Sequence, residues 1–359
     1  AVATALAISS QLATAQSVEN EESVERITVR GAFFGQQAAA GVKTPTLLVN
    51  VPQSVSVVSA EQIAEQALFS VADVMQYTPG VSIGQGEDHR DQITIRGQNT
   101  TADFFVDGLR DDVQYFRPLY NLERVEILRG ANALLFGRGG GGGVVNRVTK
   151  VAETSSDFTR LNAGIDTFSA GSISIDTNKA IDANNAFRLN GVFDTIDSHR
   201  DFKDGERYAL NPTYTWMVSD DTMVVSSYEY VNDDRIVDRG VPSLNNSPLK
   251  GNRDTFFGDT DFNNTTLEAH IARIRVDHTL NQHWNINGTV QFADYDKAYQ
   301  NLYPVNFNDE ATTVTLDGYR DTTGRENLLF QLNLIGQFLT GNLEHTVLTG
   351  FEYGNQDTH

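Results

Sequence analysis

Long segments of alternating apolar and polar residues in the second half of the chain limit its possible folds more than any other feature. In the segment 284–292, Trp284, Ile286, Val290 and Phe292 alternate with asparagine, threonine and glutamine residues. A period of two places the apolar side chains on one face of a β-strand and the polar ones on the other. Nine such segments are predicted, near 157–168, 169–179, 185–197, 206–218, 222–231, 265–280, 283–299, 326–340 and 343–356.

The lengths of these segments and of their connections favour a membrane protein. Strands of soluble proteins usually have about five or six residues, whereas a tilted strand needs about 9–11 to cross a bilayer. Short connections at 219–221, 281–282 and 340–342 lie between long ones at 232–264 and 300–325. Short turns at one end and long loops at the other are typical of outer-membrane β-barrels. The alternative is a soluble β-sandwich, whose strands would be shorter and whose connections would be more even.

The composition argues against several other classes of protein. The chain has 27 Lys and Arg against 47 Asp and Glu, a net charge of −20, whereas binding of nucleic acid needs a basic face. Without cysteine there is no disulfide, thiolate metal site or cysteine nucleophile. The seven histidines show no metal-ligand spacing, and no Ser-His-Asp or paired-carboxylate arrangement indicates an enzyme. The glycine run 137–142 fits G-x-G-x-x-G, but the strand-like residues after it argue against dinucleotide binding.

Residues 51–150 form a compact mixed segment with five distinctive phrases in a fixed order. They are VPQSVSVV from Val51, ADVMQYTPGV from Ala72, ITIRG from Ile93, FVDGLRD from Phe105 and LERVEILRG from Leu122. Together they resemble the plug domain of TonB-dependent outer-membrane receptors, specifically the ferric-siderophore branch. The resemblance implies a mixed α/β plug at 51–150, followed at 151–359 by the N-terminal part of a membrane-spanning antiparallel β-barrel. About nine of the family's 22 strands would be present, so we expect a fragment.

The residues ahead of this segment have two expected roles. Residues 1–15 end in Ala-Thr-Ala, a signal-peptidase pattern, and are expected to be the remnant of a signal peptide; a small surface helix is the alternative. Residues 16–50 are polar and are expected to form a flexible periplasmic segment. Within it, Glu25, Arg26, Ile27, Thr28 and Val29 look like the TonB box, which pairs with the energy-transducing protein TonB. A short extended peptide of this kind can add as a strand to the edge of a partner's sheet. A linker with chance alternation is the alternative.

The resemblance also implies site residues on the plug. Arginine, tyrosine and their neighbours on its outward loops suit an anionic iron chelate through charge-assisted hydrogen bonds and aromatic contact. The ligand-binding candidates are His89, Arg90, Arg96, Tyr115, Phe116, Arg117 and Tyr120. For each of them, contact with the barrel wall is the alternative. The expected structural positions are Gly97, Asp107, Gly108, Arg129, Gly130 and Arg138. Arg96, Arg129 and Arg138 are expected to form forked bonds with carboxylates.

The function implied by the resemblance is energy-coupled, TonB-dependent uptake of a ferric siderophore across the outer membrane of a Gram-negative bacterium. The expected partners are TonB, the ferric siderophore, and outer-membrane lipid and lipopolysaccharide, with no nucleic acid. No cofactor is expected, because iron arrives as a siderophore chelate, and no enzyme activity is expected. The alternatives are a receptor for cobalamin or a carbohydrate, and a secreted β-rich binding protein. The sequence leaves the siderophore chemotype, hydroxamate or catecholate, open.

Overall fold

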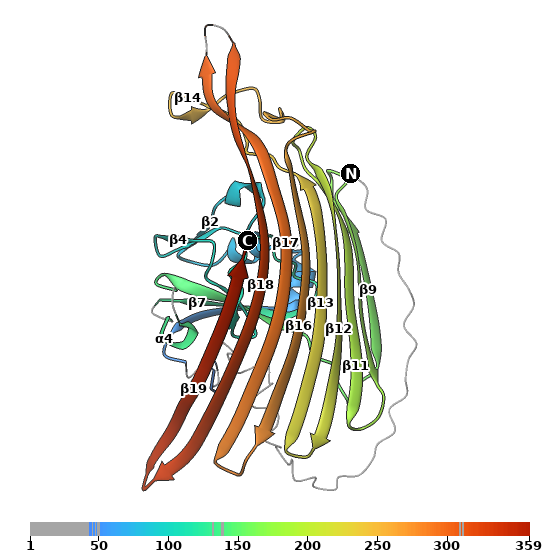
Figure 1. The fold of residues 1–359 in the computed structure, drawn as a ribbon, viewed down its shortest axis with the longest axis vertical. Helices are drawn as coiled ribbons and strands as arrows, with labels where there is room; N and C mark the ends of the chain where they lie inside the picture. The colour runs from blue at the N-terminus through green and yellow to red at the C-terminus, as the bar shows by residue number, and fades with distance from the viewer. Residues whose placement is uncertain are drawn as a thin grey trace, which may run out of the picture.

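The computed structural model describes residues 43–359, except 45, 47, 49–50, 131–132, 138–139, 309 and 311. A tall curved sheet, the outer sheet, holds a smaller domain on its concave side (Figure 1). This inner domain comprises residues 51–150. The predicted signal-peptide remnant, the TonB box and Arg138 lie outside the described residues. Within the described part, no helix has both the length and the apolar character needed to cross a bilayer.

The inner domain is built from two small sheets and short helices. The sheets have the strand orders β1-β7-β8-β5-β6 and β2-β3-β4, and only the β5–β8 pair is parallel. The strands are β1 (Ser54–Ser59), β2 (Val81–Ile83), β3 (Ile93–Ile95), β4 (Gln98–Thr100), β5 (Phe104–Val106), β6 (Leu109–Arg110), β7 (Leu122–Arg129) and β8 (Gly143–Thr149). The helices are α2 (Ala60–Glu65), α3 (Val71–Met75), the 3-10 helix η3 (Gly86–Asp88) and α4 (Ala133–Phe136). This confirms the predicted mixed α/β class.

Two tight turns of the inner domain follow from its Arg-Gly and Asp-Gly pairs. Arg96 and Gly97, with φ of 50° and 83°, connect β3 to β4. Asp107 and Gly108, with φ of 50° and 81°, connect β5 to β6. Positive φ at both central residues is typical of type I′ hairpins, which residues such as Asp-Gly favour. The glycine run leads directly into strand β8, so the dinucleotide-binding pattern lacks the helix that it requires.

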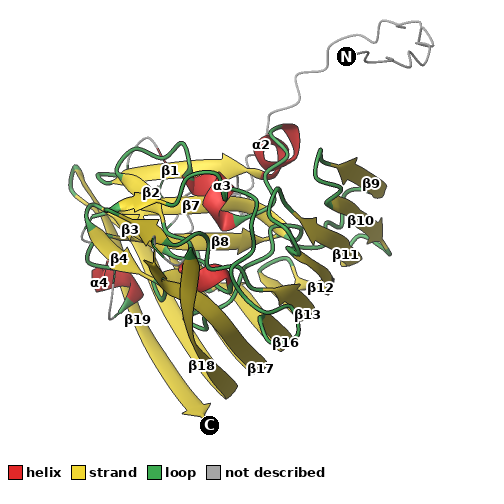
Figure 2. Ribbon diagram, turned by 90° about the horizontal axis from the view of Figure 1, so that it is seen from above, coloured by secondary structure: helices red, strands yellow, loops and turns green. Residues whose placement is uncertain are grey.

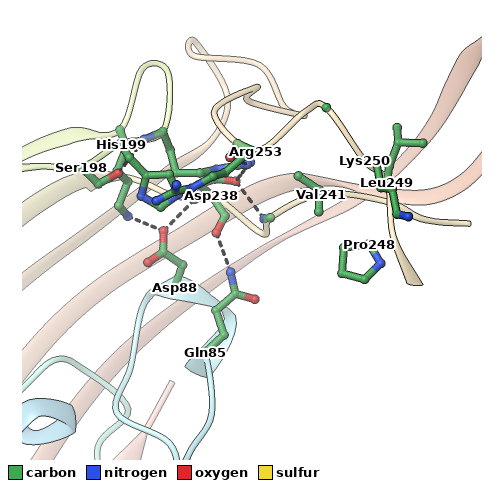
Figure 3. A pocket seen from close by; sticks show the side chains of 14 residues that line it. Gln85, Asp88, Ser198, His199, Asp238, Val241, Pro248, Leu249, Lys250 and Arg253 are labelled. Atoms are coloured by element: carbon green, nitrogen blue, oxygen red, sulfur yellow. Dashed lines mark hydrogen bonds and ion pairs between the residues drawn. The ribbon is translucent and has the colours of Figure 1, made fainter. Parts of the chain in front are cut away.

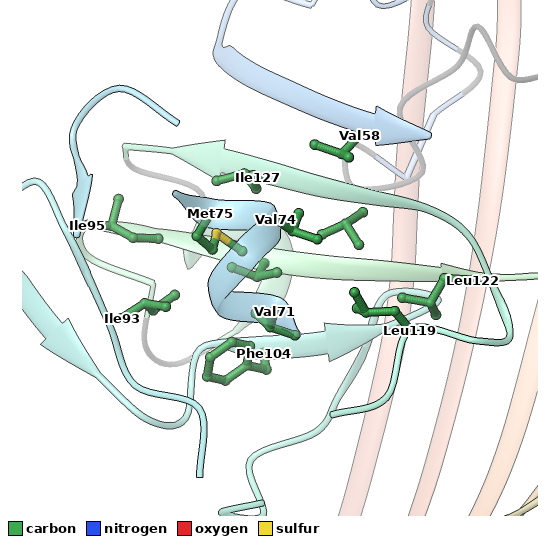
Figure 4. Close-up of a cluster of buried hydrophobic side chains, with 12 residues drawn as sticks. Val58, Val71, Val74, Met75, Ile93, Ile95, Phe104, Leu119, Leu122 and Ile127 are labelled. Carbon is green, nitrogen blue, oxygen red and sulfur yellow. The ribbon is translucent and has the colours of Figure 1, made fainter. Parts of the chain in front are cut away.

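The core of the inner domain lies around helix α3 (Figure 4). Ser70 and Asp73 form a capping box that fixes the start of this helix. Its residues Val71, Val74 and Met75 are buried and pack in one cluster with Ile93, Ile95, Phe104 and Ile127 from the strands around them. Burial of each such side chain contributes about 1.5–3 kcal/mol. The inner domain therefore has an apolar core of its own.

The outer sheet has nine antiparallel strands, which confirms the predicted number. Its order is β19-β18-β17-β16-β13-β12-β11-β10-β9, so each strand pairs with its neighbour in sequence within this sheet. The strands are β9 (Phe158–Ile165), β10 (Gly171–Ala180), β11 (Asn185–Asp197), β12 (Asp204–Ser219), β13 (Thr222–Ile236), β16 (Asn264–Thr279), β17 (Trp284–Asn308), β18 (Thr313–Thr340) and β19 (Leu343–Thr358). Seen from above, the sheet forms an arc around the inner domain (Figure 2).

The two ends of the outer sheet differ. The turn end carries the short connections 181–184, 220–221, 280–283 and 341–342, whereas the loop end carries 166–170, 198–203, 237–263 and the connection of β17 to β18. The longest of these loops includes a small hairpin of β14 (Ser243–Leu244) and β15 (Ser247–Pro248). The predicted long loop at 300–325 is wrong, because β17 and β18 continue as a paired ribbon beyond the sheet (Figure 1). A register shift at Pro304 lets the ladder pass a residue that has no N–H to donate.

The polarity of the outer sheet is the reverse of that in a soluble β-protein. Phe292 and Phe187 on its convex face are 46% and 38% exposed, whereas the adjacent Gln291 and Arg188 are each 2% exposed. At these positions the predicted alternation places apolar side chains outward and polar ones toward the inner domain. A lipid-facing wall around a polar interior has this arrangement, and a soluble sandwich would have the opposite one.

Candidate functional site

A pocket of about 670 Å³ opens between the inner domain and the loop end of the outer sheet (Figure 3). This volume lies in the range of small-molecule sites, about 300–1,000 Å³. Two lining residues belong to the inner domain, and the others come from connections 198–203 and 237–263 of the loop end. The lining residues are Gln85, Asp88, Ser198, His199, Arg200, Lys203, Asp238, Gly240, Val241, Pro248, Leu249, Lys250, Gly251 and Arg253. The pocket thus joins three segments that are distant in sequence.

Ion pairs fix the floor of this pocket. Lys203 forms an ion pair with Asp88 and donates to the backbone carbonyl of Ile236 at 2.9 Å. Arg200 donates to both carboxylate oxygens of Asp238, with Nη2 3.0 Å from Oδ1. Asp88 also accepts a bond from the backbone N–H of Asp238 at 2.7 Å. The inner domain is therefore tied to connections 198–203 and 237–263 at this point.

The inner-domain loop under the pocket has an unusual backbone. Gly86, Glu87 and Asp88 are consecutive residues with φ of 63°, 55° and 62°. A non-glycine residue in this region costs on the order of 1–3 kcal/mol, so neighbouring contacts must hold the loop. Tyr299 donates to the carbonyl of Glu87 at 3.0 Å, and Tyr319 donates to its carboxylate at 3.0 Å. The outer sheet thus stabilises a strained apex of the inner domain.

Of the predicted ligand residues, His89 and Arg90 lie in this apex region. His89 is 6% exposed, accepts a bond from Lys297 Nζ at 2.6 Å to Nδ1, and lies 3.9 Å from the ring of Tyr299. Burial, and then the charges of Lys297, Arg90 and Arg239, lower the pKa of His89 to about 2. Arg90 pairs with Glu87 at 3.0 Å. Neither residue lines the pocket; both follow directly after the strained loop 86–88.

Arg117 and Tyr115 lie buried inside the inner domain and do not line the pocket. The Arg117 side chain is 0% exposed and donates to Asp111 at 3.0 Å and to Asp91 at 3.3 Å. Tyr115 is buried and donates to Asp111 at 3.0 Å. Burial raises the pKa of Asp91, and the charge of Arg117 opposes that rise. These residues form a buried polar network with Arg147, which also pairs with Asp111.

The other three ligand candidates also lie away from the pocket. The guanidinium of Arg235 lies 4.6 Å from the ring centroid of Phe116. Tyr120 donates to Glu229 of β13 at 3.3 Å. These two candidates therefore contact the wall, the alternative given from the sequence. Arg96 is exposed in the β3–β4 turn and is not among the pocket residues.

The predicted structural positions hold the inner domain together and to the sheet. Asp107 pairs with Arg273 of β16 and accepts two bonds from Thr149, at 2.9 and 2.7 Å. Gly130 has a φ of 108°, and Gly97 and Gly108 form the two hairpin turns. Among the described residues, Arg129 meets no carboxylate, contrary to the expectation; it donates to the carbonyl of Pro79 at 2.7 Å and to the hydroxyl of Ser56 at 2.9 Å.

Sequence reasoning missed Asp88, Arg200, Lys203 and Asp238, which form the pocket floor. The sequence feature that could have pointed to them is the presence of charged residues in connections that show no regular pattern. Within the described ranges, no group of three or more histidine or acidic side chains is arranged to hold a metal ion.

The comparison with known proteins decides the family. The model of the TonB-dependent receptor plug domain matches residues 48–144. The probable TonB-dependent siderophore receptor PiuA of Acinetobacter baumannii is 28% identical over 342 residues, which cover 89% of this chain and 45% of PiuA. The inner domain is a plug domain of the TonB-dependent receptor family. The residues matched by the plug model include all of the inner domain except most of β8.

Two further comparisons agree with this match. The ferrichrome outer membrane transporter/phage receptor of Escherichia coli K12 is 26% identical over 397 residues, which cover 98% of this chain and 53% of that protein. The crystal structure of PiuA matches with a TM-score of 0.83 and 27% identity, over 90% of this chain and 48% of PiuA. The chain spans about half the length of the curated relatives that it matches. The nine-stranded outer sheet is thus the counterpart of part of a receptor barrel.

Proposed function

We propose that this receptor takes up a ferric siderophore across the outer membrane of a Gram-negative bacterium, with energy supplied through TonB. The observation that carries the proposal is the pocket above the inner-domain apex, between connections 198–203 and 237–263 of the loop end. A chelate held there has the inner domain directly beneath it. Transport therefore requires the inner domain to rearrange, which fits a receptor that depends on an external energy source.

In this proposal the loop end faces the outside of the cell and the turn end faces the periplasm. The apolar convex face supports a location in the membrane, with outer-membrane lipid and lipopolysaccharide around it. Iron stays wrapped by its chelator, so the receptor needs no metal ligands of its own and no catalytic group.

The contacts that hold the inner domain against the sheet define what TonB must loosen. Pulling on the TonB box, residues 25–29, would load the Asp107–Arg273 pair in the middle of the sheet and the Asp88–Lys203 pair at the pocket. Breaking the second pair would also disturb the pocket floor. Energy input at the periplasmic side would thus weaken chelate binding at the outer side.

The first experiment is a titration of the complete receptor, purified in detergent, with ferric siderophores, cobalamin and oligosaccharides, followed by intrinsic fluorescence. Saturable quenching by a ferric chelate alone supports the proposal. Binding of cobalamin or an oligosaccharide instead would keep the architecture and overturn the iron assignment. Deletion of residues 25–29 should abolish cellular uptake of the radiolabelled chelate and leave its binding unchanged. Uptake that survives this deletion would contradict TonB coupling through these residues.

A further inference from the structure

We infer that the pocket selects ferric chelates that carry both negative charge and aromatic rings, the tris-catecholate class, over neutral trihydroxamate chelates. This inference rests on the proposed function and names its substrate class. It is drawn from the charges and the apolar side chains that line the pocket.

The pocket contains more cations than its own carboxylates neutralise. Arg200 is paired with Asp238, and Lys203 is paired with Asp88. Lys250 and Arg253 line the same pocket with exposed side chains. Within the described part of the chain, neither of these two side chains forms a hydrogen bond or ion pair. The pocket therefore keeps two uncompensated positive charges, in a chain whose net charge is −20.

The same excess continues behind the pocket, at the apex of the inner domain. Arg90 and Arg239 share a single carboxylate, that of Glu87, at 3.0 and 3.5 Å. Gly240, which follows Arg239, lines the pocket. An anion in the pocket thus meets Lys250 and Arg253 directly, and Arg239 is adjacent in sequence to the lining residue Gly240.

Chelate charge is the property that such a site discriminates. Three catecholate dianions around one Fe³⁺ leave a net triple negative charge, whereas three hydroxamate monoanions leave none. A cation about 8 Å from a triply charged anion in water-like surroundings favours binding by about tenfold at low salt and by about threefold at physiological salt. The neutral chelate gains almost nothing from the same cation.

The apolar part of the lining favours aromatic anions over small polar ones. Val241, Pro248 and Leu249 line the pocket. Pro248 and Leu249 lie next to Lys250 on one side of it (Figure 3). Catechol rings can pack on these side chains while their oxygens bind the metal, and a cation over a ring face adds further attraction. A purely polar anionic chelate, such as a carboxylate complex, would leave this surface unused.

The test compares two ferric chelates built on one tripodal scaffold, one with three dihydroxybenzoyl groups and one with three hydroxamates. Binding to the complete receptor is measured for the wild type, for the double variant Lys250→Gln/Arg253→Gln, and for Lys179→Gln. Lys179 is an exposed lysine paired with Asp157 and is not part of the pocket, so its variant controls for the loss of a distant charge.

We expect the wild type to bind the catecholate chelate at least about tenfold more tightly than the hydroxamate, and the double variant to lose about tenfold or more of that affinity. Hydroxamate binding and the control variant should stay within about twofold, and salt should weaken only the catecholate complex. Equal or tighter hydroxamate binding, or an unchanged double variant, overturns this inference and leaves the proposed function intact. Binding of neither chelate, with binding of cobalamin or an oligosaccharide, overturns the proposed function and this inference with it.

Discussion

Replacing Arg117 with methionine tests whether the buried polar network, rather than the apolar core alone, holds the inner domain in its fold. The guanidinium makes bonds to Asp91 and Asp111 and to the carbonyls of Val113 and Tyr115, and it lies 4.0 Å from the ring centroid of Phe104. Methionine fills much of the same volume but provides no donor.

The expected cost follows from what remains of each partner. Without the Arg117 side chain, Asp111 still bonds to Arg147 and Tyr115. Among the described residues, the Asp91 carboxylate would keep only the backbone N–H of residue 117, at 3.0 Å. Removing one member of a buried ion pair destabilises a protein by about 3–5 kcal/mol. Since about 1.4 kcal/mol is tenfold in an equilibrium, local opening should become at least about a hundredfold more frequent.

Amide hydrogen exchange of the complete receptor in detergent measures this opening directly. Protection of the amides in β5 and in residues 111–122 should fall at least about a hundredfold in Arg117→Met. Arg96→Met, at an exposed arginine of the same domain, should change it less than about threefold. A loss below about tenfold in Arg117→Met would refute the view that the network stabilises the domain.

The pH dependence provides a second, independent readout. The pKa of Asp91 is raised in the folded protein, so its contribution to stability is present below the unfolded pKa and is lost as the pH rises through the folded pKa. Removing Arg117 raises that pKa further, because the cation that opposes the rise is gone. The defect of Arg117→Met should therefore shrink on acidification, and a defect that grows instead would contradict this assignment.

Three further predictions concern other positions of the inner domain. In a urea titration, Gly143→Ala should destabilise the inner domain by about 2 kcal/mol or more, because the added Cβ would lie 2.4 Å from the carbonyl oxygen of Leu128. The control Gly164→Ala places its Cβ in open space and should leave stability unchanged. Asp107→Asn should weaken attachment to the sheet by about 1.5–3 kcal/mol through its bond to Arg273, seen as faster exchange of the Thr149 amide; unchanged exchange would contradict it. Because the pKa of His89 is lowered in the folded protein, its contribution to stability is present above pH 6.5 and is lost as the pH falls toward 2. The imidazole stays neutral in the folded protein, so its NMR signals should not shift between about pH 8 and 4.

The regular parts of the fold could be predicted because their signal is local. Alternation along each strand separates outward from inward side chains, as the exposed Phe292 beside the buried Gln291 shows. The Arg-Gly and Asp-Gly turns follow from two adjacent residues. The ribbon beyond residue 300 was not predicted, since Pro304 and scattered polar residues suggest a loop. Its register depends on cross-strand pairing, which overrides that local signal.

The candidate site could be predicted only in part, because burial and long-range contacts decide it. Arg117 has the chemistry of a ligand residue, but its partner Asp91 is distant in sequence and encloses it within the domain. The pocket floor joins Asp88 to Lys203 and Asp238 from separate connections. No periodicity in those connections reveals that they converge.

The inner domain meets the outer sheet mainly through hydrogen bonds and ion pairs, with one apolar cluster around Val113, whereas its own centre is apolar. Water can replace each polar contact as it breaks, so the inner domain can detach from the sheet one bond at a time. The apolar core offers no such stepwise route, since exposing part of it to water costs free energy at once. Under a pulling force, the contacts between the inner domain and the outer sheet should therefore break before the apolar core of the domain does. A passage could then open while much of the domain remains folded.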